Sequence, residues 1–473
     1  MSNPEEFDLV ILGSGEAGKY LAWTFASKGK RVAVVERKYI GGSCPNIACL
    51  PSKSIIHSAK IASYCRSGTE FGVAELVGPV EMMAVRDRKR KMVDDLVADH
   101  LERYRASGAE LVLGNGVFIA AKTIQVAIDG GETRTLRGQN VVVCTGSRAR
   151  VDDTPGLKDS RPLTHIEVLD LDHVPAHLIV LGGGYIGLEL AQAYRRLGSR
   201  VTVVERNETL IHREDPDVTT AIGELFHDEG AEVFTGTKIS RIEGETAKSV
   251  RLHATAGGQS ILIEGSHLLV AAGRTPNTDG IGLAQAAIEV DARGHVKVNE
   301  RLQTTAPDVW AVGDCAGSPY FTHAAYDDFR VVRDNIEGGN RVTTGRQVPF
   351  CLFTDPELAR IGLNEREAKQ QCISYRLVKI PMRKVPRTRT LSETRGFLKA
   401  LIAGDDQILG FTAFGAGAGE IMSVVQVAML AGIPYMELRD AILTHPTIAE
   451  GLTMLFSTEP GWCSEALKHV PLN

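Results

Sequence analysis

The sequence has few of the features that mark secreted, membrane-spanning or nucleic-acid-binding proteins. Only 8 of its 473 residues are cysteines, too few for a scaffold held together by disulfides. No uninterrupted apolar run approaches the ~18 residues of a membrane helix, and the acidic N-terminus leads directly into an apolar segment without the pattern of a signal peptide. We therefore expect a cytosolic protein with no membrane contact.

An excess of charge of one sign is also lacking. The 53 Lys and Arg residues nearly balance the 58 Asp and Glu residues, which leaves a net charge of −5. Without a basic excess we expect no nucleic-acid partner, and without CxxC pairs or a helical HxxxH pattern we expect no metal site. Glycine, in contrast, is abundant, with 48 residues. The composition is that of an α/β protein with many tight turns, and the length allows about three domains.

The first glycine cluster follows an apolar run of strand length, residues 7–12. Gly13, Gly15 and Gly18 form a GxGxxG pattern, which allows a tight turn, close approach of the backbone to a pyrophosphate and close packing of the next helix. The following strand ends at Glu36, 23 residues after Gly13, where a carboxylate can bind ribose hydroxyls. This order of elements predicts a dinucleotide-binding fold.

The same pattern returns after the apolar strand at 178–181. Its three glycines are Gly182, Gly184 and Gly187. The next strand ends at Glu205, again 23 residues after the first glycine of the set. Two such folds imply two nucleotides, and flavin with nicotinamide is the obvious redox pair. Glu205 would repel a 2′-phosphate and favours NAD, whereas Arg206 and Arg213 could accept that phosphate, so both NAD and NADP stay open.

Three later strands end in glycine or in a polar residue. These ends are Thr145–Gly146, Gly273 and Asp314. Ligands bind at the carboxyl ends of strands in doubly wound sheets, so we expect cofactor contacts there, although Asp314 could instead cap the turn that follows it. Beyond residue 340 the pattern changes to strand pairs and helices without a glycine fingerprint. The predicted fold is therefore α/β, with two doubly wound Rossmann-like domains and a C-terminal α+β domain.

The stretch GGSCPNIACLPSK, residues 41–53, contains two cysteines with four residues between them. Cα atoms five residues apart in a regular α-helix are separated by roughly 8.6 Å, whereas a disulfide tolerates at most about 7 Å. If Cys44 and Cys49 bond, the helix between them must be irregular. Pro45 suits a first helical turn, and a cysteine near a helix N-terminus has a lowered pKa. Spacing alone favours the alternative, in which the two cysteines are buried, inert thiols.

The last informative stretch is THPTIAE, residues 444–450. His445 precedes a proline, which disfavours helical geometry and places the histidine just before a helix. Glu450 falls in the first turns of that predicted helix, where it could hold one tautomer of the ring. A histidine fixed in this way can act as a base near neutral pH. The alternative is a histidine that is satisfied structurally in a cap or an interface.

Together these motifs resemble the flavin-dependent pyridine nucleotide–disulfide oxidoreductases, the family of dihydrolipoamide dehydrogenase, glutathione reductase and mercuric reductase, over essentially the whole chain. The resemblance implies an enzyme with FAD, with NAD or NADP, and with an active site shared between the two subunits of a homodimer. It divides the chain into an FAD-binding domain (1–149), an NAD(P)-binding domain (150–270), a central domain completing the FAD site (271–345) and a dimerisation domain (346–473).

The resemblance also assigns roles to single residues. Cys44 and Cys49 become a redox-active disulfide, with Cys49 nearer the flavin and Cys44 attacking the substrate. The other implied catalytic residues are the ion pair of Lys53 and Glu189 beside the flavin, the aromatic gate Tyr185, and the base His445 with Glu450 from the other subunit. The implied cofactor contacts are Gly13, Gly15, Gly18, Glu36, Gly42, Ser43, Thr145, Gly146, Asp314, Ala324, Gly182, Gly184, Gly187, Glu205, Arg206 and Gly273.

The implied reaction carries electrons from nicotinamide through flavin to the Cys44–Cys49 disulfide and on to a disulfide, an oxidant or a metal ion. The segments FTDPELARIG and TRTLSETRGF resemble the mercuric-reductase-like branch most. However, the chain has only Cys463 near its end instead of a vicinal cysteine pair, and Pro45 and Ala48 alter the usual redox stretch. We therefore favour a disulfide or a small oxidant over Hg(II). Dihydrolipoamide dehydrogenase and a flavin NAD(P)H oxidase or electron-transfer protein are the alternatives.

Overall fold

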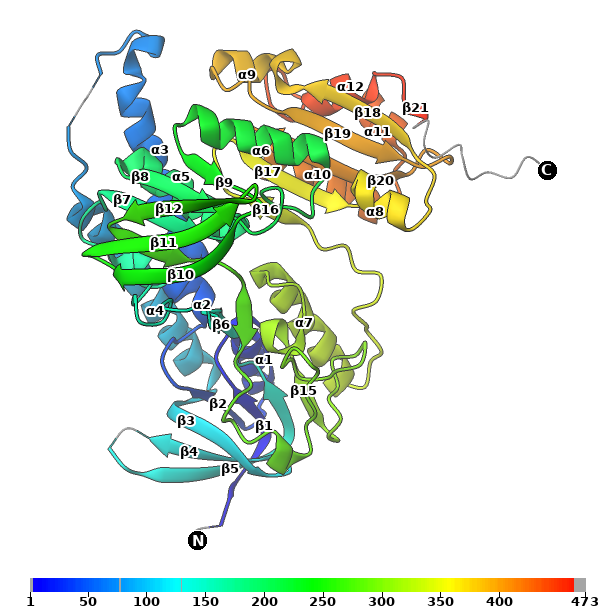
Figure 1. Cartoon of the computed structure of the whole chain (residues 1–473). Coiled ribbons are helices and arrows are strands. Elements are labelled where there is room, and N and C mark those ends of the chain that lie inside the picture. The colour runs from blue at the N-terminus through cyan, green and yellow to red at the C-terminus, as the bar shows by residue number, and fades with distance from the viewer. Residues whose placement is uncertain (1–2, 76–77, 129, 463–473) are drawn as a thin grey trace.

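The computed structural model describes residues 3–75, 78–128 and 130–462 (Figure 1). Its first sheet has six strands: β1 (Glu5–Leu12), β2 (Val32–Glu36), β3 (Glu110–Ala120), β4 (Thr123–Ile128), β5 (Thr133–Val143) and β15 (Val309–Ala311). β1 pairs in parallel with β2 and β5, and β15 adds a further parallel strand beside β5. The central strands are rich in Val and Ile and buried on both faces, as parallel strands covered by helices must be.

Helices cover this sheet and carry the glycine loop. α1 (Glu16–Ser27) begins directly after the first glycine cluster and packs beside α7 (Thr322–Ile336), with α4 (Met82–Ser107) also against α1. β15 and α7 belong to this unit although they follow the second nucleotide fold in the chain. Both elements lie in residues 271–345, for which we expect a central domain completing the FAD site. The domain boundaries themselves remain predictions.

The second sheet is parallel and has four strands. In spatial order they are β13 (His267–Val270), β7 (His177–Leu181), β8 (Arg200–Val204) and β9 (Glu232–Phe234). Its helices include α5 (Tyr185–Leu197) and α6 (Pro216–Asp228), and an antiparallel sheet of β10 (Lys238–Glu245), β11 (Ser249–Ala256) and β12 (Gln259–Gly265) adjoins it. The two connections to the first unit, β6 (Ser147–Ala149) and β14 (Arg274–Pro276), pair with each other. The predicted pair of dinucleotide folds is confirmed.

The C-terminal part is an antiparallel sheet with helices. Its strands, in spatial order, are β16 (Phe350–Leu352), β17 (Glu357–Gly362), β20 (Ile408–Gly415), β19 (Phe397–Ile402), β18 (Arg376–Pro381) and β21 (Gly461–Trp462). Its helices are α8 (Glu365–Gln370), α9 (Pro386–Thr390), α10 (Ala418–Leu430), α11 (Tyr435–Asp440) and α12 (Gly451–Phe456). The expected α+β character is therefore confirmed. In Figure 1, α6 of the second unit lies beside this sheet. Across the described ranges, no helix combines the length and apolar character that a membrane span needs.

Candidate functional site

The redox stretch forms two helices with a break between the cysteines. α2 (Ser43–Ile47) contains Cys44, α3 (Cys49–Arg66) starts at Cys49, and Ala48 between them has φ −135° and ψ −102°, far from helical values. The backbone between the cysteines therefore has the irregularity that a Cys44–Cys49 bond would require. The amide of Asn46 donates to the carbonyl of Gly42 at 2.7 Å and fixes the start of this stretch. Both cysteines are thiols in this structure.

The two thiols differ in acidity. The hydrogen bond from Cys44 is the largest effect on Cys49, and with Thr322 and Lys53 it outweighs desolvation and lowers the pKa of Cys49 to about 6. The same contact, together with burial, raises the pKa of Cys44. Cys44 therefore keeps its proton while Cys49 becomes the thiolate, which is the polarity that the resemblance implies. Sγ of Cys49 lies 3.3 Å from Oγ1 of Thr322, the first residue of α7. Sequence reasoning missed Thr322, and only its place at the start of a helix could have indicated it.

An ion pair lies on the two helices beside the cysteines. Nζ of Lys53, on α3, is 2.7 Å from Oε2 of Glu189, on α5, and the glutamate side chain is only 8% exposed. The backbone amide of Phe353 donates to the other glutamate oxygen at 3.0 Å, and the centroid of the Phe353 ring lies 4.6 Å from Nζ of Lys53. The structure thus brings together the predicted pair and adds Phe353, which no sequence pattern indicated.

Tyr185 begins α5, directly after the second glycine loop. Its ring centroid lies 5.3 Å from that of Phe350 and 6.4 Å from that of Phe321. Burial raises the pKa of its hydroxyl, so the side chain is a neutral phenol at physiological pH. Phe321 immediately precedes Thr322, and therefore the aromatic cluster and the thiolate side of the site are joined through the start of α7.

The first glycine loop has the geometry of an anion cradle. A Cβ added to Gly18 would lie 2.4 Å from the carbonyl oxygen of Gly13, and one added to Gly42 would lie 2.6 Å from Cα of Gly15. The N-terminus of α1 has no side-chain cap, so its amides are available to a phosphate. These features fit the pyrophosphate of FAD.

The acidic residue of this fold is tied to the loop. Oε2 of Glu36 accepts bonds from the backbone amide of Ser14 at 2.9 Å and from its hydroxyl at 2.7 Å. Ser43 begins α2 directly after Gly42, the glycine that packs against Gly15 of the loop. Sequence reasoning missed Ser14, although its position inside the glycine pattern offered a signal. The carboxylate is therefore placed beside the loop that would hold the dinucleotide.

The second glycine loop repeats this construction. A Cβ on Gly187 would lie 2.0 Å from the carbonyl oxygen of Gly182, and the N-terminus of α5 after Gly184 has no side-chain cap. Oε2 of Glu205 accepts the backbone amide of Gly183 at 2.6 Å, in the same way as Glu36 accepts that of Ser14. The geometry fits a second dinucleotide. Arg206 and Arg213, which follow Glu205, are both exposed.

The predicted contacts at the strand ends also gather between the first two units. The carboxylate of Asp314, after β15, accepts a hydrogen bond from Ser147 and lies 3.5 Å from Nε of Arg274. Gly146 and Gly273 adopt left-handed φ values of 67° and 118° at the two connecting strands. Thr145 follows β5, and Ala324 is buried within α7. Asp314 is therefore engaged in side-chain contacts that join the two connections.

His445 and Glu450 lie in the C-terminal part. Nδ1 of His445 is 2.8 Å from Oε2 of Glu450, and the histidine side chain is 70% exposed whereas that of Glu450 is 8% exposed. The predicted helix start was wrong, because residues 444–450 form turns in which Thr447 bonds to the carbonyl of Thr444, and α12 begins only at Gly451. The ring-holding contact is nevertheless present. No hydrogen bond or ion pair within the described ranges connects His445 to the cysteines of the same chain. Cys463 lies outside those ranges.

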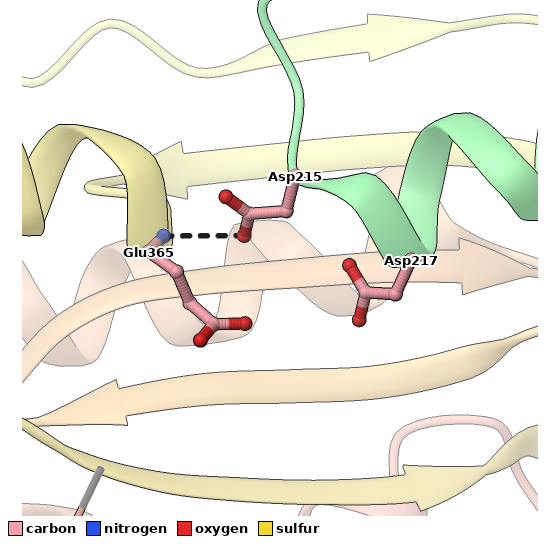
Figure 2. Close-up of side chains that lie close together, drawn as sticks. All are labelled: Asp215, Asp217 and Glu365. Carbon is pink, nitrogen blue, oxygen red and sulfur yellow. Dashed lines mark hydrogen bonds between the residues drawn. The ribbon is translucent and has the colours of Figure 1, made fainter. Parts of the chain in front are cut away.

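Three carboxylates, those of Asp215, Asp217 and Glu365, form a cluster that includes no residue of the redox stretch. Figure 2 shows their side chains. Ligand oxygens this close, all within 4.8 Å, could in principle hold a metal ion. Here Nζ of the fully buried Lys399 lies 2.7 Å, 2.9 Å and 3.1 Å from the three side chains, respectively. The ammonium therefore already supplies the positive charge that such a cluster needs.

Comparison with known proteins identifies the family to which the chain belongs. Residues 7–328 match the model described as pyridine nucleotide-disulphide oxidoreductase, and residues 348–456 match the dimerisation domain of the same family. The chain belongs to this family. It is accordingly an FAD-dependent oxidoreductase that uses NAD(P)H, and it carries the dimerisation domain of the family.

Several members of the pyridine nucleotide-disulphide oxidoreductase family match nearly the whole chain. The probable pyridine nucleotide-disulfide oxidoreductase RclA of Escherichia coli (strain K12) is 34% identical over 464 residues, which are 96% of this chain and 99% of that protein. A mercuric reductase of Staphylococcus aureus is 31% identical over 455 residues, 95% of this chain and 82% of that one. The solved Cu(II) complex of the HOCl-induced flavoprotein disulfide reductase RclA from E. coli superposes with a TM-score of 0.87 at 32% identity, covering 96% of this chain and 99% of that one.

Proposed function

We propose that this flavoprotein transfers two electrons from NAD(P)H to an acceptor through the Cys44–Cys49 pair. The observation that carries the proposal is the setting of Cys49, whose Sγ lies 3.3 Å from Oγ1 of Thr322 and whose pKa is lowered by Cys44, Thr322 and Lys53. A relay needs such a stable thiolate at Cys49 and a second thiol, Cys44, that attacks the acceptor once a base has taken its proton. With a disulfide acceptor, NAD(P)H and one proton yield NAD(P)⁺ and two thiols. The inert-thiol alternative does not account for Thr322 and Lys53 around Cys49.

The residues of this chain would hold the flavin, orient the reacting groups and supply protons to the acceptor. FAD, when bound, supplies the two-electron chemistry between a nicotinamide and a disulfide. Lys53 places a cation at the site and Glu189 keeps that cation in position. Tyr185, which begins α5 and packs against Phe350, would cover the flavin until the nicotinamide binds. Cys44 attacks the acceptor and forms a mixed disulfide, which Cys49 then resolves to regenerate the Cys44–Cys49 bond.

We also propose that the active site is shared between two subunits. His445 is well exposed and held by Glu450, so its ring is presented outward from the C-terminal domain. Large apolar side chains are exposed nearby in sequence, with Val427 at 65%, Leu430 at 66% and Ile442 fully exposed. An interface with a second copy would bury these side chains and bring the histidine to the cysteines of the other subunit. There it would take up and return the proton of the attacking thiol. A cytosolic location remains a prediction from composition.

For the acceptor we propose a disulfide or a small oxidant, with metal ions as a further class. The relatives named above include a disulfide reductase solved with Cu(II) and a mercuric reductase. The intact His445–Glu450 pair supports proton-coupled thiol chemistry and therefore also keeps dihydrolipoamide dehydrogenase as a second candidate. A panel of lipoamide, glutathione disulfide, Hg(II), Cu(II) and quinones, each with NADH and with NADPH, separates these acceptors.

Anaerobic titration with one equivalent of NADH or NADPH tests the relay. We expect a long-wavelength charge-transfer band between thiolate and flavin in the wild-type enzyme, and its loss in Cys49→Ser. An oxidase or electron-transfer protein with bystander cysteines would show flavin reduction without that band and equal turnover in both forms. This second result would rule out the relay.

A further inference from the structure

The buried cation of the acidic cluster connects the C-terminal sheet to the nicotinamide side of the enzyme. Lys399 lies on β19 and its side chain is 0% exposed. Asp215 and Asp217 belong to the start of α6 in the second unit, and Glu365 belongs to α8 of the C-terminal part (Figure 2). A buried ammonium requires such partners, since an unpaired charge in the interior is very costly. Lys399 therefore holds two domains at one point.

The hydrogen-bond partners of the Asp215 carboxylate lie outside its own helix. It is the N-cap residue of α6, yet its side chain does not cap that helix. Its carboxylate instead accepts the backbone amide of Glu365 at 3.1 Å (Figure 2) and that of Arg366 at 3.0 Å, both at the start of α8. Nζ of Lys399 is the third group on the same carboxylate, at 2.7 Å. The geometry of Asp215 is thus directed to contact between domains and not to its own helix.

The segment that ends at Asp215 is the one that encloses the second glycine loop. At its beginning, Glu205 accepts the amide of Gly183. Further along, the amide of Ile211 donates to the carbonyl of Gly183 at 2.9 Å, and a Cβ on Gly183 would lie 2.5 Å from the side chain of Leu210. The segment therefore holds the middle glycine of the loop from two sides.

Other residues of the C-terminal part form hydrogen bonds and an ion pair with the same segment. Nδ2 of Asn364 donates to the carbonyl of Arg213 at 3.1 Å, a guanidinium nitrogen of Arg366 donates to that of His212 at 2.7 Å, and Nε of Arg360 lies 3.1 Å from Oε2 of Glu214. Arg360 also lies over the ring of Phe350, the neighbour of Tyr185. These contacts attach the C-terminal part to the segment that holds the glycine loop. Arg360 also connects this segment to the aromatic gate.

We propose that Lys399 is a positioning residue for NAD(P)H, which acts through Asp215 to hold residues 205–215 against the second glycine loop. This inference rests on the proposed assignment of that loop to the nicotinamide nucleotide. Lys399 touches neither nucleotide nor reacting atoms, and it acts only by fixing the wall of the site. Its loss loosens the binding of NAD(P)H and leaves the exchange between thiols and flavin intact.

The test uses the purified holoenzyme and rapid-mixing measurements with whichever of NADH and NADPH reduces the wild type faster. In Lys399→Met we expect the apparent dissociation constant of that nucleotide to rise about tenfold, the size of effect that residues remote from a ligand produce. The limiting rate of flavin reduction at saturation and the charge-transfer band formed with dithiothreitol are expected to stay at wild-type values. Dithiothreitol enters through the cysteines and needs no nucleotide.

Two further variants control the experiment. Lys379→Met removes a lysine that binds Asp217 at 2.6 Å from a half-exposed position and does not bind Asp215, so nucleotide affinity is expected to stay unchanged. Asp215→Asn keeps the shape of the side chain and leaves Asp217 and Glu365 to pair with Lys399. If Lys399→Met does not fold, nucleotide affinity is measured in Asp215→Asn in its place. Unchanged affinity in both Lys399→Met and Asp215→Asn overturns the inference, as does an equal loss in the nucleotide and dithiol measurements. A wild type without a charge-transfer band after dithiothreitol contradicts the relay instead.

Discussion

Cys49 and Thr322 are 273 positions apart in the chain, yet the cysteine Sγ lies 3.3 Å from the threonine Oγ1. The hydroxyl can donate to a thiolate, and Thr322 begins a helix of 15 residues, whose N-terminus also favours negative charge. Both effects act on the same sulfur that Cys44 and Lys53 stabilise. The thiolate is therefore stabilised from three separate elements of the fold.

Replacing Thr322 by Val is expected to raise the pKa of Cys49 above its value of about 6. A hydrogen bond to a charged group contributes about 1.5–3 kcal/mol, which corresponds to a rise of roughly one to two pH units. The thiolate is the form present above the pKa, so its charge-transfer band disappears as the pH falls through that value, and it will disappear at a higher pH in Thr322→Val. Absorbance of the dithiol-reduced holoenzyme against pH measures this. Thr322→Ser keeps the hydroxyl and should titrate like the wild type, whereas coincident curves for all three proteins would contradict the prediction.

The local motifs could be predicted from the sequence, but the contacts that tune them could not. The spacing predicted an acidic residue, Glu36 or Glu205, at the end of the strand that follows each glycine loop, but not its bond to a loop amide 22 positions away. Phe353 reaches Glu189 across 164 positions and from a different domain. No periodicity encodes such a contact, because it depends on how whole domains pack. The turns at 444–450 were missed for a local reason, since side-chain bonds of Thr447 replace the first helical turn.

Replacing Lys53 by Met is expected to slow flavin reduction by NAD(P)H at least tenfold, about 1.4 kcal/mol in the barrier. The substitution removes the cation and leaves the buried carboxylate of Glu189 at the proposed flavin site. Stopped-flow absorbance of the bound flavin at saturating nucleotide gives the rate. Lys60→Met is the matched control on the same helix, because Lys60 pairs with Asp355 and Glu393 instead. Equal rates in both variants would remove Lys53 from the reductive step.

Two glycines of the second loop are expected to respond differently to alanine. A Cβ on Gly187 would lie 2.0 Å from the carbonyl oxygen of Gly182. Gly187→Ala should therefore lower the free energy of unfolding by about 1–3 kcal/mol, as overpacking typically does. A Cβ on Gly184 meets nothing within 4 Å and its φ is −91°, so Gly184→Ala should unfold at the wild-type temperature. It would nevertheless occupy space where the pyrophosphate is proposed to bind and should weaken NAD(P)H binding. Thermal unfolding and nucleotide titration separate the two effects, and wild-type nucleotide affinity in Gly184→Ala would contradict the proposed site.

The proposal that His445 serves the cysteines of the other subunit can be tested with mixed dimers. Cys49→Ser and His445→Gln are each expected to be nearly inactive as homodimers in disulfide reduction. In a mixed dimer of the two, isolated through two different affinity tags, a shared site pairs the intact Cys49 of one subunit with the intact His445 of the other. One of the two sites is then complete, and activity should return to about half of the wild-type value per dimer. If each subunit used its own histidine, both sites of the mixed dimer would carry one defect and no activity would return. The ring of His445 is exposed and held by Glu450, and within the described ranges it makes no hydrogen bond or ion pair with the cysteines of its own chain, so we expect the first result.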